Sequence, residues 1–118
     1  MPSRLRVGIV GAGGKMGRII ADGLAQDETF EIAYLYDPIG GKIEGIGEIS
    51  RDFERLLSSP CTHVVDFSTG QAVFEQGPKI LLAGRRYLVG TTGYPQGTIE
   101  ALTEACEKGK TSCLVVPN

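Results

Sequence analysis

Residues 6–17 read RVGIVGAGGKMG and join a short apolar run to a cluster of glycines. The apolar run, residues 6–10, is rich in β-branched side chains, which is typical of a buried parallel strand. Residues 11–17 have the composition of a tight loop, and apolar residues then recur at helical spacing over residues 16–26. The segment therefore predicts a strand, a glycine-rich turn and a helix in succession.

Strand-like and helix-like segments alternate along the rest of the chain. Further strands are expected at residues 30–36, 62–67, 86–90 and 112–116. Helices are expected at 50–57, at 70–82 with an interruption at Gly77-Pro78, and at 98–108. Residues 39–49 contain four glycines and predict a loop with at most a short edge strand. The alternation predicts a single α/β domain, residues 1–118, with a doubly wound parallel sheet covered on both faces.

Polar residues and glycines indicate where these helices begin and end. Ser50 is expected to cap the helix at 50–57, and either Ser68 or Thr69 to cap the helix after the third strand. Gly109 is expected to end the last helix. The inward side of that helix is expected to carry Ile99, Leu102 and Cys106.

Composition restricts the possible classes of protein. The chain has 118 residues, 42% hydrophobic and 22% charged, so one ordered soluble domain is expected. The net charge is −2 with no polybasic run, so neither nucleic acid nor a membrane surface is an expected partner. Three cysteines without a CxxC pair predict neither a disulfide framework nor a metal site. No signal-peptide pattern or membrane-length apolar run is present, so a cytoplasmic protein is expected.

The glycine loop has the composition of a phosphate-binding turn between a strand and a helix. Its residues are Gly11, Ala12, Gly13, Gly14, Lys15, Met16 and Gly17. Glycines at this junction permit a sharp turn, let backbone N–H groups approach a pyrophosphate and let the helix pack on the strand. The spacing departs from GxGxxG, so a merely tight turn remains an alternative.

Asp37 favours the nucleotide interpretation. It closes the second expected strand, 20 residues after Gly17, where a carboxylate can accept hydrogen bonds from an adenosine ribose. Asp37-Pro38 could instead only begin a turn. Together, loop and acid predict a Rossmann-like domain that binds NAD(P)H. An acid here favours NADH, whereas Lys15 and Lys42 could tolerate the extra phosphate of NADPH, so the preference stays open.

Two more loops follow expected strands at the edge where open α/β sheets bind ligands. They are residues 67–70, FSTG, and residues 90–93, GTTG. Their hydroxyl and amide groups can hold a nicotinamide carboxamide, or they can serve only as helix caps and turns.

Five motifs in this order resemble the N-terminal, cofactor-binding domain of dihydrodipicolinate reductase, an NAD(P)H enzyme of the diaminopimelate route to lysine. They are GAGGKMG at 11–17, Asp37, DFST at 66–69, GTTGY at 90–94 and VPN at 116–118. The resemblance implies that residues 11–16 hold the pyrophosphate and Asp37 the ribose. It places Gly90, Thr91 and Thr92 against the nicotinamide beside Phe67 and Ser68. Val116, Pro117 and Asn118 would form the last cofactor contact.

The chain also departs from the resembled family. The family's second domain, with its histidine- and lysine-bearing catalytic motif, is missing, and Thr69-Gly70 stands where Pro-Glu is common. No catalytic group is expected: His63 lies away from the ligand edge, and Tyr94 and Lys15 lack an evident orienting partner. Cys106 and Cys113 are expected to pack in the core.

Three functions remain open at this point. The first is the cofactor domain of a dihydrodipicolinate reductase, present as a fragment, monomeric or weakly dimeric and inactive alone. The second is a stand-alone dinucleotide-binding or sensing module without catalysis. The third is a truncated oxidoreductase of amino acids or sugars, against which the GTTG loop argues.

Overall fold

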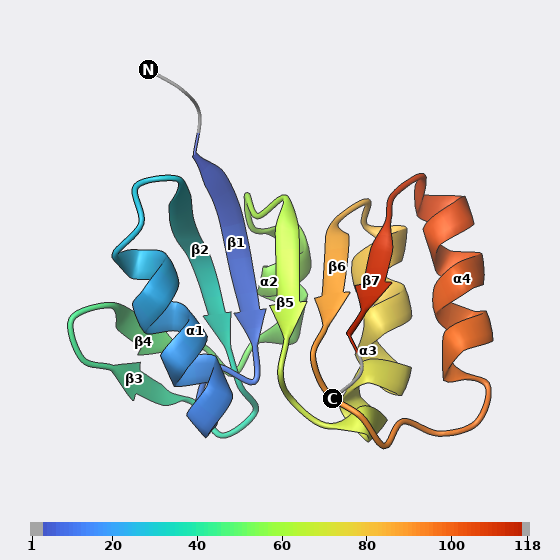
Figure 1. The fold of residues 1–118 in the computed structure, drawn as a ribbon, viewed down its shortest axis with the longest axis horizontal. Coiled ribbons are helices and arrows are strands. Elements are labelled where there is room, and N and C mark those ends of the chain that lie inside the picture. Colours follow the sequence, from blue (N-terminus) through green and yellow to red (C-terminus); the bar gives the residue numbers. More distant parts are fainter. Residues whose placement is uncertain (1–3, 117–118) are drawn as a thin grey trace.

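The computed structural model describes residues 4–116 and contains a five-stranded parallel sheet in the order β2-β1-β5-β6-β7 (Figure 1). Its strands are β1 (Leu5–Val10), β2 (Phe30–Tyr36), β5 (His63–Asp66), β6 (Arg86–Val89) and β7 (Cys113–Val115). The helices are α1 (Lys15–Ala25), α2 (Phe53–Ser58), α3 (Gly70–Leu82) and α4 (Thr98–Gly109). The expected Rossmann-like α/β fold is confirmed.

The strand register brings several loops to one edge of the sheet. Val10, the last residue of β1, pairs with Tyr36 on β2 and with Asp66 on β5. Asp66 in turn pairs with Val89, the last residue of β6. Because parallel strands in this register end together, the segments after β1, β2, β5 and β6 meet at the carboxyl edge.

Each face of the sheet has its own core. One core joins the sheet to α2, α3 and α4 through buried residues such as Leu56, Ile80 and Leu102. The other joins β1 and β2 to α1 and to a small hairpin through Ala21 and Ile43. The hairpin is formed by β3 (Gly41–Ile43) and β4 (Gly47–Ile49), so residues 39–49 contain two short strands where a loop was expected.

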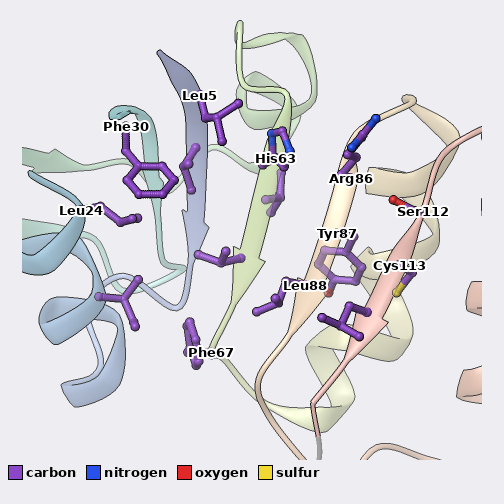
Figure 2. A pocket seen from close by; sticks show the side chains of 15 residues that line it. Leu5, Leu24, Phe30, His63, Phe67, Arg86, Tyr87, Leu88, Ser112 and Cys113 are labelled. Carbon is purple, nitrogen blue, oxygen red and sulfur yellow. The ribbon is translucent and has the colours of Figure 1, made fainter. Parts of the chain in front are cut away.

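The expectation that both faces are covered holds only for part of the sheet. On the α1 side, a groove of about 460 Å³ runs over β5, β6 and β7. Leu24 and Phe30 lie at one side of it, Ser112 and Cys113 at the other, and Phe67 near its lower end (Figure 2). Leu114 on β7 is 59% exposed, so within residues 4–116 this stretch of sheet carries no helix on that face.

The α2 cap differs from the expectation. Asp52, not Ser50, caps α2, accepting a hydrogen bond from the Arg55 amide at 3.2 Å. Ser50 is held instead by β2, since its amide donates to the carbonyl of Leu35 and its carbonyl accepts from the Asp37 amide. The cap, and with it the start of the helix, therefore lies two residues later than expected. Of the two cap candidates for α3, Thr69 accepts from the Ala72 amide at 3.1 Å and is the cap.

Two further expectations about helices are wrong. Pro78 lies inside a continuous α3, because the buried face of that helix, including Gly77 and Ile80, packs on the core despite the lost amide. Gly109, expected to stop α4 after Lys108, is instead the last residue of the helix and packs against the Leu81 carbonyl, and the left-handed cap is Lys110. Its inward residues include Leu102 and Ala105; Cys106 is partly buried and Ile99 is exposed.

Candidate functional site

Backbone groups join the start of the glycine loop to the end of β2. The amides of Gly11 and Ala12 both donate to the carbonyl of Tyr36, at 3.0 and 3.1 Å. Gly11 has a φ of +81°, which a residue with a side chain rarely adopts. A Cβ on Gly17 would lie 2.1 Å from the Gly11 carbonyl oxygen, so the first turn of α1 packs directly on the loop. Glycine at these positions is required by the geometry of the turn.

The start of α1 is open in front of this loop. Gly14 is the N-cap and supplies no side chain to the helix amides. A Cβ added at Gly14 would meet only the Gly11 carbonyl, at 3.5 Å, so the space outside is free. Uncapped helix amides with open space before them form the cradle that a pyrophosphate needs. The residues present therefore fit a dinucleotide.

Asp37 lies beside this cradle at the end of β2. Its Oδ2 accepts a hydrogen bond from the Gly13 amide at 3.1 Å, and its Oδ1 accepts from the Ile39 amide at 3.0 Å. The bond to Ile39 forms the turn that was the alternative interpretation, and the bond to Gly13 joins the acid to the glycine loop. A cavity of about 480 Å³ opens here, lined by Gly14, Asp37 and Ser68 among others.

A second cavity, of about 290 Å³, lies at the same edge beyond Phe67. It brings together six of the residues predicted from the sequence: Met16, Phe67, Gly90, Thr91, Thr92 and Val116. Phe67 lines both cavities. A Cβ on Gly90 would lie 2.2 Å from the Phe67 ring, so a side chain there would displace the ring. Pro117 and Asn118 lie outside the described residues.

Sequence reasoning missed Asp66, the fully buried carboxylate that ends β5. It accepts hydrogen bonds from the Tyr87 hydroxyl and from the amide and hydroxyl of Ser68. Burial raises the pKa of Asp66, and the bonds from Ser68 and Tyr87 oppose that rise. Burial also raises the pKa of Tyr87, which lies against this carboxylate. The available signal was an acidic residue directly after Val64 and Val65, inside the strand expected at 62–67, because a carboxylate in a buried strand needs hydrogen-bond partners.

The remaining candidate groups lie apart from these cavities or lack partners. His63 begins β5 and so lies at the amino edge, where its Nδ1 contacts the Thr62 hydroxyl at 2.8 Å. Burial and the nearby Arg86 lower the pKa of His63. The side chains of Lys15 and Tyr94 make no hydrogen bond to the part of the chain that is described.

Residues 4–116 contain no group of three or more His, Cys, Asp or Glu side chains placed to hold a metal ion. Nor does this part of the chain have a helix with the length and apolarity to cross a bilayer.

Comparisons with known proteins agree on one family. The family described as "Dihydrodipicolinate reductase, N-terminus" matches residues 5–118. The 4-hydroxy-tetrahydrodipicolinate reductase of Dictyoglomus turgidum is 33% identical over 93% of this chain and 44% of its own length. That of Synechococcus elongatus is 34% identical over the whole chain and 49% of its own length. The chain thus spans about half the length of these curated relatives.

Solved structures show the same fold. A dipicolinate-bound dihydrodipicolinate reductase from Paenisporosarcina superposes with a TM-score of 0.83 at 24% identity, covering 98% of this chain and 48% of that one. The WlbA dehydrogenase of Bordetella pertussis, in complex with NADH and UDP-GlcNAcA, has a TM-score of 0.80 at 15% identity, covering 97% and 37%. The family match over residues 5–118 identifies the chain as a member of the dihydrodipicolinate reductase family, corresponding to its N-terminal domain.

Proposed function

We propose that this domain binds NADH or NADPH across the carboxyl edge of the sheet and presents the nicotinamide for hydride transfer. The observation that carries the proposal is the open cradle at Gly14. Asp37 lies on one side of it, and on the other lies the cavity of about 290 Å³ beyond Phe67, called the Phe67 cavity below. One edge then offers sites for a pyrophosphate, a ribose and a flat ring. Relatives whose names or complexes include reductases and NADH support this assignment.

Each part of the edge has a proposed role. Residues 11–16 hold the pyrophosphate with backbone amides, and Asp37 accepts hydrogen bonds from the adenosine ribose. Gly90, Thr91 and Thr92 lie against the nicotinamide, with Phe67 and Ser68 beside it. Val116, Pro117 and Asn118 form the last contact with the cofactor.

The bound cofactor supplies a hydride to an acceptor, and this chain binds and orients it. Lys15 and Tyr94 are the nearest side chains able to donate a proton, and neither has an orienting partner among residues 4–116. We therefore propose that the reduction needs a second domain. In the whole protein the substrate is a cyclic, imine-type dicarboxylate of lysine biosynthesis, as the names of the relatives suggest. The domain alone is proposed to be a monomer or weak dimer.

Calorimetric titration of Gly14→Val with NADH tests the phosphate cradle. The new side chain enters open space, so the domain stays folded, but its branches block the pyrophosphate. We expect at least about a hundredfold weaker binding, as for loss of several charge-assisted hydrogen bonds. The control is Gly23→Val, on the same helix with nothing within 4 Å of its added Cβ. Equal affinities for both variants would contradict the cradle assignment.

A further inference from the structure

Asp66 and Tyr87 form a buried polar pair directly behind the loops of the carboxyl edge. Asp66 is 0% exposed and Tyr87 is 2% exposed. The Tyr87 hydroxyl donates to Oδ2 of Asp66 at 2.5 Å, while Oδ1 accepts from the Ser68 amide at 2.9 Å and from the Ser68 hydroxyl. All three bonds are donated to the carboxyl oxygens, which is the arrangement that an ionised carboxylate requires.

The same pair is connected to both loops that line the Phe67 cavity. The Asp66 carbonyl accepts from the Gly90 amide at 2.9 Å. The Ser68 carbonyl accepts from the Thr91 hydroxyl at 3.3 Å. A continuous set of hydrogen bonds therefore runs from Tyr87 through Asp66 and Ser68 to Thr91. Through it, the ends of β5 and β6 are held in one arrangement.

Stability alone gives little reason for this pair. A buried carboxylate loses its hydration, and well-packed apolar residues of similar volume often stabilise a fold as much or more. What a carboxylate with three directed donors adds is a fixed geometry for the groups around it. Here those groups are the backbone of Ser68 and, next to it, the ring of Phe67.

We propose that Asp66 and Tyr87 are positioning residues for the nicotinamide half of the cofactor. They orient the loops at 67–69 and 90–92, and within residues 4–116 their side chains make no hydrogen bond to the glycine loop or to Asp37, although the Ser68 backbone packs beside Gly11. This inference rests on the proposed function. It predicts that removing the hydrogen bond between Asp66 and Tyr87 lowers the affinity for ligands that carry nicotinamide. The affinity for ligands that lack nicotinamide but keep both riboses, such as ADP-ribose, should be unchanged.

Tyr87→Phe tests this role, with NADH and ADP-ribose titrated separately. The change removes one hydroxyl and leaves one oxygen of Asp66 without its donor. We expect roughly tenfold weaker NADH binding and unchanged ADP-ribose binding, as for one lost buried hydrogen bond. Asp66→Asn should give the same pattern. The control is Tyr34→Phe. The Tyr34 hydroxyl donates to the Asp52 carbonyl at 2.7 Å and lies 2.6 Å from the Ser50 hydroxyl, and Tyr34 lines neither cavity, so its loss should change the affinity for neither ligand.

The possible results separate this inference from the proposed function. If the unaltered chain binds neither ligand, the proposed function fails and the positioning role falls with it. If the unaltered chain binds both and Tyr87→Phe weakens both equally, or weakens neither, the proposed function stands and the positioning role is overturned. Circular dichroism checks the fold, and if either variant unfolds the other one decides.

Discussion

The two ends of the carboxyl edge are built in different ways. At the glycine loop, backbone groups make the main contacts: two amides donate to the Tyr36 carbonyl, and α1 packs on the loop at Gly17. Around Phe67, side chains make the main contacts, because the buried carboxylate of Asp66 accepts hydrogen bonds from Tyr87 and Ser68. Both arrangements join neighbouring strands, since the Tyr36 carbonyl comes from β2 and the Tyr87 hydroxyl from β6. The first needs glycine at particular adjacent positions and so leaves a sequence motif, whereas a side-chain contact between two strands does not.

Gly17→Ala should have the largest effect in this comparison. The added Cβ would lie 2.1 Å from the Gly11 carbonyl oxygen and 2.9 Å from the Ala12 Cα, both held between β1 and α1. We expect about 3 kcal/mol less stability in urea unfolding, at the upper end for overpacking, because no side-chain rotation relieves a backbone clash. Gly23→Ala, on the same helix without neighbours, should stabilise by about 0.5–1 kcal/mol. Equal effects would show that the close packing of α1 is unimportant.

Gly70→Ala makes the matching change at the other end. Its added Cβ would lie 2.4 Å from the Gly93 carbonyl and 2.5 Å from the Tyr94 amide. These atoms belong to the loop between β6 and α4, whereas those beside Gly17 lie at the junction of β1 and α1, so we expect a smaller loss of about 1–2 kcal/mol in the same assay. A loss larger than that of Gly17→Ala would reverse the ranking of the two ends.

Asp37→Ala should weaken NADH binding about tenfold, as expected for the loss of a hydrogen bond to a charged group. It should weaken NADPH binding less. In the proposed binding mode the carboxylate would accept a hydrogen bond from a ribose hydroxyl of NADH and would repel the extra phosphate of NADPH. Parallel calorimetric titrations measure both ligands. Equal losses would mean that Asp37 serves only to order the glycine loop through Gly13 and Ile39.

His63→Gln, at the opposite edge of the sheet, should have the smallest effect of these variants, and the effect should be on the pH dependence of stability. Burial and Arg86 lower the pKa of His63, so between its folded pKa and the ordinary value of 6.5 the unfolded chain binds more protons. The stabilisation from neutral His63 is therefore present above pH 6.5 and is lost as the pH falls through the folded pKa. Urea unfolding at several pH values should show a flatter profile for the variant, with unchanged NADH affinity. A change in NADH affinity would link the two edges.

Most of the fold followed from local patterns, because glycine turns and β-branched runs are properties of adjacent residues. The strand at Phe30–Tyr36 was predicted with its observed bounds, and a glycine-rich turn was predicted where one joins β1 to α1. The interruption predicted at Gly77-Pro78 was wrong, because burial of one face of α3 outweighs the hydrogen bond that proline removes. Asp66 was missed because its partner Tyr87 comes from another strand. The groove over β6 and β7 likewise became visible only in three dimensions.

An NMR titration of the ¹⁵N-labelled chain with NADH tests the central claim most directly, because it reports both whether the cofactor binds and where. The account predicts saturable shifts at the amides of Gly13, Gly14, Asp37, Thr91 and Thr92, and none at His63 or Leu114. Shifts confined to the groove over β6 and β7, or no shifts from a folded chain, would contradict a dinucleotide site at the carboxyl edge.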